Sequence, residues 1–177
     1  MNISHHNRLE ELKIKASVLL KDLNAAAPEK HLKAAERLLK LPFLAHSNTG
    51  LILADRDFFR LKHTQAVIAA ENGCNSWDTL RRKVIEEDCL YHRSCGVFLN
   101  IWFARYDEAK NYHIAHGGYL LRFRRDFIVC TADYIQCLGM AHLRDDWRSI
   151  GYNWVEPLDK EAWKRLFKCA KNNYLKR

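Results

Sequence analysis

Three side chains of metal-binding types stand close together near the middle of this sequence, as Cys89-x-x-His92-x-x-Cys95. Zinc prefers thiolate and imidazole ligands, but a structural zinc site takes four of them. The nearest further candidates are distant along the chain: His113, His116, Cys130 and His142. On one continuous helix the three close ligands would spread over about 120° around the axis, which makes a poor chelate. We therefore expect no metal site and no cofactor.

A second set has side-chain types that serve in catalysis: His113, His116, Asp145 and Asp146. Histidine and carboxylate groups act together only if the fold joins them, and the spacing here does not require it. The sequence has no phosphate-binding loop, no G-x-S-x-G, no H-E-x-x-H and no dinucleotide fingerprint. We expect a non-catalytic protein. The alternative is a small enzyme or toxin-like effector with its site in the C-terminal half.

Arginines and aromatic residues alternate in the segment "YLLRFRRDF". Such a mixture suits contacts to phosphates and bases, as in single-stranded nucleic-acid binding. A strand would place Arg122 and Arg124 on one face, with Leu121 and Phe123 on the other. The same pattern is therefore also typical of an ordinary half-buried hairpin.

The last eighteen residues form a basic amphipathic pattern. Apolar residues recur at helical spacing along one stripe, namely Trp163, Leu166, Phe167, Ala170 and Tyr174. Such a helix docks on a core, lies on a membrane surface or enters a partner's groove. We predict that the cations of the hairpin and of this helix pair with phosphates or carboxylates of nucleic acid or an acidic protein face. These cations are Arg122, Arg124, Arg125, Lys164, Arg165, Lys168 and Lys171.

The formal net charge of +8 is concentrated in the second half of the chain. Residues 1–90 hold 14 Lys and Arg against 12 Asp and Glu, a net charge of +2. Residues 91–177 hold 15 against 9, a net charge of +6. A basic surface favours an anionic partner. A solvated helix face that only aids solubility would give the same counts.

The first half of the chain reads as helices. Apolar spacing predicts one helix over 9–23 and another that Asn24 caps and Pro42 ends. An irregular passage follows over 42–59. The next helix stops at Gly73, and Ser76 caps the helix after it.

The second half mixes strands and helices. The apolar segment 97–103 is expected to be a strand or, alternatively, to run into the helix predicted over 107–116. We also expect a hairpin near 119–130 with a three-residue connection. A short helix after Thr131 precedes an irregular aromatic stretch over 144–157, and Asp159 caps the terminal helix 160–175. The prediction is a predominantly helical α+β protein with a helical module, 1–92, and an α+β module, 97–177.

Two helical segments, "LKIKASVLLKDLNAAAPEKHLKAAERL" and "RLKHTQAVIAAENGCNSWDTLRRKV", carry a pattern of matched positions. These are Lys13, Ala16, Leu19, Leu20, Leu61, Gln65, Ile68, Ala69, Gly73, Ser76, Trp77 and Leu80. In this pattern the chain resembles a small helical bacterial module found before ankyrin repeats and in chains called glyoxalase-related. The resemblance implies a helical first half but no chemistry, because no metal-binding set of His and Glu accompanies it. The module's habit of preceding unrelated domains suggests a protein–protein adaptor as a further alternative.

The helix pair around Gly73 also has the spacing of a DNA-binding helix-turn-helix, with Ala69 four residues earlier. A recognition helix reads bases with its N-terminal residues, and Asp78 there would repel phosphate. Glu86, Glu87 and Asp88 offset the basic run 81–83. We therefore expect a plain helical hairpin.

Two features bear on the compartment. No apolar run approaches the ~18 residues of a membrane span, and the first residues lack the apolar core of a signal peptide. The six cysteines are expected to be free thiols rather than a disulfide framework. We predict a cytoplasmic protein of unknown oligomeric state.

Overall fold

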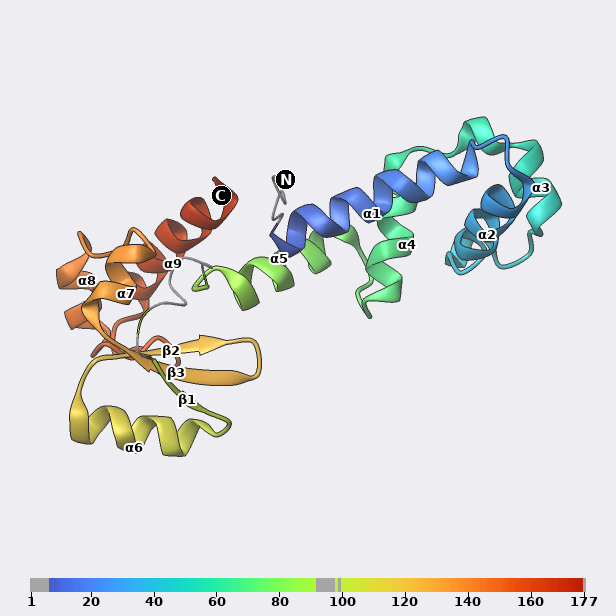
Figure 1. Cartoon of the computed structure of the whole chain (residues 1–177). Coiled ribbons are helices and arrows are strands. Elements are labelled where there is room, and N and C mark those ends of the chain that lie inside the picture. The colour runs from blue at the N-terminus through green and yellow to red at the C-terminus, as the bar shows by residue number, and fades with distance from the viewer. Residues whose placement is uncertain (1–6, 92–97, 99, 177) are drawn as a thin grey trace. The chain divides into compact units, whose positions relative to one another are not determined.

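The structure, a computed structural model, describes residues 7–91, 98 and 100–176. Over these residues the chain is mostly helical with one small antiparallel sheet (Figure 1), which confirms the predicted α+β class. It forms two compact units, Met1–Val84 and Ile85–Arg177. The division falls within one helix, α5 (Trp77–Asp88). The boundary predicted between residues 92 and 97 lies outside the described residues.

The N-terminal unit is built from helices whose ends follow local capping rules. In order they are α1 (Arg8–Leu23), α2 (Pro28–Leu38), η1 (Pro42–Leu44), α3 (Thr49–Ala54), η2 (Arg56–Phe58), α4 (Leu61–Glu71) and the start of α5. The α4–α5 connection is as predicted: Gly73 adopts a φ of +70°, and the Cys74 amide donates to the Ala69 carbonyl. The Ser76 Oγ accepts from the Thr79 amide at 3.1 Å and so caps α5.

Two predictions for this unit are wrong. Asn24 does not cap α2; it ends α1, where its side chain donates to the Leu20 carbonyl at 2.9 Å. Proline takes the first position of α2 instead, a site that needs no amide hydrogen. The passage 42–59 is also not irregular, because Asn48 accepts from the Leu51 amide at 3.0 Å and starts α3. The buried faces of α1, α2 and α4 meet in an aliphatic core that α3 covers through Ile52.

The C-terminal unit holds β1 (Ile101–Phe103), α6 (Tyr106–His116), β2 (Tyr119–Phe123), β3 (Asp126–Cys130), α7 (Ala132–Cys137), α8 (Arg144–Ser149) and α9 (Lys160–Leu175). The strand order is β1-β3-β2, with both pairs antiparallel. Figure 1 shows α6 on one side of the sheet and α7, α8 and α9 on the other. Leu120 and Leu121, which point to opposite faces, are both fully buried. The hairpin is therefore covered on both faces rather than half-buried.

Four further details of the fold bear on the predictions: the first two differ from them and the last two agree. The hairpin connection is the two residues Arg124 and Arg125, not three, because Asp126 pairs with Phe123 inside the ladder. The stretch 144–157 is only partly irregular, since it begins with α8, whose Trp147 is completely buried. Asp159 caps α9 as predicted, accepting from the amides of the second and third helical residues. Each of the five cysteines among the described residues is a free thiol.

No helix in the described part of the chain is long and apolar enough to cross a membrane.

Candidate functional site

The hairpin turn holds the most constrained of the predicted cations. Arg124 has a φ of 55°, in the left-handed region that side chains other than glycine rarely adopt. Its Nε donates to the Asp88 carboxylate at 3.0 Å, and its guanidinium lies 5.0 Å from the centre of the Phe123 ring. The hydrogen bond to the buried Asp88 carboxylate raises the pKa of Arg124. Arg124 thus anchors the turn to the end of α5, and its guanidinium is already paired with the Asp88 carboxylate.

The two neighbouring arginines are exposed and have no carboxylate partner among the described residues. Arg122 donates through Nε to the Arg124 carbonyl at 3.1 Å, which holds its guanidinium beside the turn. Arg125 occupies the second turn position. Both cations are available to an anion in solution.

Aromatic rings lie directly beside this turn. Tyr91 packs on Phe123 with ring centres 4.6 Å apart, and Trp102 meets Phe123 edge-on at 5.9 Å. Trp102 is 49% exposed and Tyr91 is 39% exposed, so both rings reach solvent. We call Tyr91, Trp102, Phe123, Arg122 and Arg125 the hairpin platform. It combines exposed aromatic surface with free positive charge, a combination that suits a base and its phosphate.

The predicted cations of α9 divide into two groups. Arg165 donates to Asp146 of α8 at 2.6 and 2.9 Å, and this bond raises the pKa of Arg165. Lys164 pairs with Glu161 at 2.6 Å, but both side chains are well exposed, so the pair is weak. Lys168 and Lys171 are exposed and have no acidic partner in the described residues.

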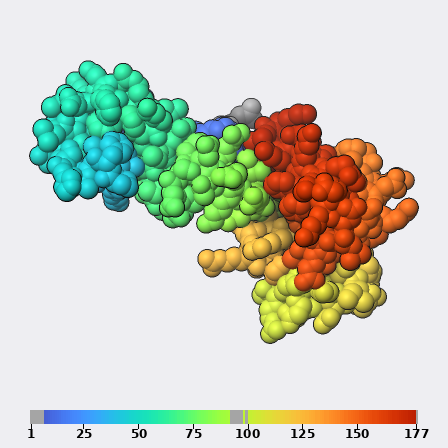
Figure 2. Space-filling view, turned by 180° about the vertical axis from the view of Figure 1, so that it is seen from behind, coloured from blue at the N-terminus to red at the C-terminus, as the bar shows by residue number. Residues whose placement is uncertain are grey.

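Lysines follow one side of α9 in a regular row. Lys160, Lys164, Lys168 and Lys171 recur at i, i+4, i+8 and i+11, which spans roughly 16 Å along a helix. This lysine row borders Trp163 and Phe167, whose rings stack at 5.2 Å next to the buried stripe. In Figure 2, α9 (red) presents side chains over the surface of the C-terminal unit. No described ion pair or hydrogen bond joins the lysine row to the hairpin arginines.

Each candidate catalytic residue contacts another part of the protein, and no described contact joins the histidines to the aspartates. The His113 Nε2 lies 3.1 Å from the Gly118 carbonyl, and His116 stacks on Tyr112 of the same helix. Asp146 binds Arg165, and Asp145 lies 3.8 Å from Arg148. These contacts hold helix ends and pack α8 against α9.

The cysteine–histidine motif is described only in part. Cys89 is buried at the start of the C-terminal unit, while His92 and Cys95 lie outside the described residues. Among the residues that the structure does describe, no three or more His, Cys, Asp or Glu side chains gather as a metal site.

Sequence reasoning missed three members of this surface: Tyr91, Trp102 and Lys160. The i, i+4 spacing of Lys160 and Lys164 in the sequence indicates that both lie on the same side of the helix. The other two could not be assigned from spacing, because they are distant in sequence from Phe123. Trp102 of β1 meets Phe123 of β2 through the pairing of both strands with β3, and Tyr91 reaches Phe123 from the segment that follows α5.

No family model, no curated protein and no solved structure matches this chain. The resemblance of the first half to the bacterial helical module therefore stays a prediction.

Proposed function

We propose that this chain is a non-catalytic binding protein whose anionic partner is single-stranded nucleic acid, held by the C-terminal unit. The observation that carries the proposal is the hairpin platform, where Trp102 and Tyr91 expose ring surface beside two arginines without carboxylate partners. Bases of any sequence stack on aromatic rings, and the arginines neutralise the adjoining phosphates. The lysine row adds further phosphate contacts at the same unit's surface.

Exposed aromatic rings distinguish this partner from an acidic protein face. The carboxylates of an acidic protein would pair with the cations alone, and Trp102 and Tyr91 would stay exposed to water. A duplex keeps its bases stacked inside, so it also leaves the rings unused. We place the protein in the cytosol on the free thiols, which persist in reducing compartments.

The test separates stacking from charge by fluorescence anisotropy with a labelled single-stranded oligonucleotide of mixed sequence. Trp102→Leu keeps apolar bulk but removes the ring, and we expect about 5- to 150-fold weaker binding, the worth of one base stack. The slope of log affinity against log salt should not change. Trp102→Phe, which retains a ring, is the matched control and should bind nearly as well as the native chain.

The charge arm uses Arg122→Gln with Arg125→Gln. Two lost phosphate contacts should reduce the magnitude of the salt slope by about 1.4, because each contact contributes about 0.7 for a single strand. Native affinity in Trp102→Leu, or a native salt slope in the double arginine variant, would remove the hairpin platform as the binding site.

A further inference from the structure

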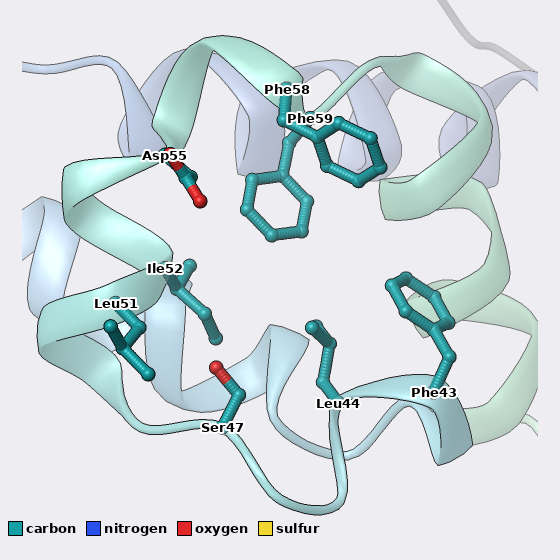
Figure 3. Close-up of a pocket in the computed structure, with 8 residues that line it drawn as sticks. All are labelled: Phe43, Leu44, Ser47, Leu51, Ile52, Asp55, Phe58 and Phe59. Atoms are coloured by element: carbon teal, nitrogen blue, oxygen red, sulfur yellow. The ribbon is translucent and has the colours of Figure 1, made fainter.

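A pocket of about 350 Å³ lies in the N-terminal unit, enclosed by the segment 43–59 (Figure 3). η1, α3 and η2 supply its apolar walls: Phe43, Leu44, Leu51, Ile52, Phe58 and Phe59. Two polar side chains, Ser47 and Asp55, complete the lining. The pocket thus belongs to the passage that separates α2 from α4.

The rim of this pocket exposes large apolar side chains. Phe43 is 60% exposed, Phe58 62% and Leu51 56%, whereas Ile52 and Phe59 are buried and form the floor. His63 of α4 stacks on Phe58 with ring centres 5.3 Å apart and so packs against the rim. Exposed apolar side chains gathered around a hollow mark an interaction site, unlike single ones scattered over a surface.

The pocket lining carries one acidic side chain. Asp55 is the one ionisable side chain in the lining, and it has no cationic partner within the described part of the chain. Figure 3 shows one of its carboxylate oxygens directed toward the open space, with the Ser47 hydroxyl on the other side of that space. The nearby Arg60 guanidinium is turned to the backbone, donating to the carbonyls of Asp57 and Phe59. A ligand that complements this pocket therefore places an apolar group in the cavity and a cationic group beside Asp55.

We infer that the pocket docks a peptide segment of a partner protein, which inserts one large apolar side chain and sets a neighbouring Lys or Arg against Asp55. The volume lies at the low end of the roughly 300–1,000 Å³ of ligand pockets, which fits one or two side chains. Peptide recognition of this kind uses an apolar anchor for affinity and a charge for register. An anionic ligand would meet the Asp55 carboxylate unfavourably.

The experiment selects 12-residue peptides from a random phage-displayed library on the full chain. Peptides that also bind the Phe43→Ala, Phe58→Ala variant are removed by counter-selection. Both phenylalanines are largely exposed, so this variant should keep its fold, which circular dichroism verifies. The enriched peptides should carry a large apolar residue within about three positions of Lys or Arg.

The second arm tests the charge with the best enriched peptide, made synthetically. Asp55→Asn preserves the shape of the pocket and should weaken binding at least fivefold at low salt. The matched control Ile114→Ala, Leu158→Ala removes two exposed apolar side chains from the other unit and should bind like the native chain. Enrichment of acidic peptides, equal binding by Asp55→Asn, or no peptide that prefers the native chain would overturn the inference. Oligonucleotide binding by the C-terminal unit is a separate readout, so either proposal can fail alone.

Discussion

The hairpin turn places an arginine where glycine or asparagine is the usual residue. Arg124 holds this conformation with two side-chain contacts, one to Asp88 and one to the Phe123 ring. Asp88 precedes Arg124 by 36 positions, and no local pattern connects them. The sequence predicts a hairpin and its arginines, but the role of Arg124 as an anchor depends on a tertiary contact.

Backbone strain at Arg124 can be measured with two substitutions that both remove the guanidinium. Arg124→Ala keeps a Cβ at a φ of 55°, whereas Arg124→Gly does not. We expect the glycine variant to be more stable than the alanine variant by about 1 kcal/mol in urea unfolding, the cost of a left-handed residue. Equal stabilities would show that the turn relaxes once the contact to Asp88 is lost.

We expect His63 to make the stability of the N-terminal unit depend on pH in mild acid. Its Nδ1 accepts from the Arg60 amide at 3.0 Å, so a protonated ring cannot keep this bond. Burial lowers the pKa of His63, and Lys62 and Arg60 lower it further. The unfolded chain therefore binds the proton more readily, and stability is present above the ordinary pKa of 6.5 and falls as the pH drops through it.

Thermal unfolding between pH 7.5 and 5 measures this dependence. His63→Gln retains an acceptor for the helix start but does not titrate. The melting temperature of the native chain should fall further over this range than that of the glutamine variant. Parallel losses in the two proteins would contradict the assignment to His63.

At the scale of elements, local rules account for the ends of several helices. Gly73, Ser76 and Asp159 act where their sequence neighbours predict, because capping involves only residues within one turn. The helices α3, α7 and α8 each span six residues, too few to show a helical period. Only α7 was predicted, from Thr131 at its start. The hairpin platform was not predicted for the same physical reason as the anchoring role of Arg124, since its rings meet through contacts between residues distant in sequence.

Two adjacent glycines end α6 before β2 and differ in their surroundings. A Cβ on Gly118, at a φ of +93°, would lie 2.8 Å from the Cys130 carbonyl oxygen. A Cβ on Gly117, at a φ of +72°, would meet no atom within 4 Å. With φ 72° and ψ −156°, Gly117 lies in a region essentially restricted to glycine, so we expect Gly117→Ala to cost about 1–3 kcal/mol. Gly118→Ala should cost more, because a backbone clash adds to the strain. Urea unfolding of both variants compares them, and an equal or smaller cost at Gly118 would contradict the packing.

At the scale of the whole molecule, the two halves of the sequence differ in net charge, and the surfaces built from them differ in charge as well. The lysine row belongs to the strongly basic half and leaves Lys160, Lys168 and Lys171 without acidic partners in the described residues. The pocket of the N-terminal unit, by contrast, carries an acidic side chain. The charge count predicted a basic surface in the second half, but the sequence did not show which cations are already paired.

The contribution of the lysine row to binding can be tested by comparing its removal with the removal of four lysines from the other unit. Changing Lys160, Lys164, Lys168 and Lys171 together to Ala should weaken oligonucleotide binding and reduce the magnitude of its salt slope by as much as about 2.8. The control changes four exposed lysines of the other unit to Ala, namely Lys21, Lys30, Lys33 and Lys40. It should keep most of the native slope, and equal losses in the two variants would assign the effect to net charge alone.

We propose that the exposed rings of the hairpin platform, beside arginines without carboxylate partners, bind single-stranded nucleic acid. The most direct measurement is the affinity of the native chain for one labelled oligonucleotide, compared as a single strand and as a duplex at two salt concentrations. We expect tighter binding of the single strand at both concentrations, with both affinities falling steeply as salt rises. No binding at low salt, or a duplex bound as tightly as the single strand, would contradict it.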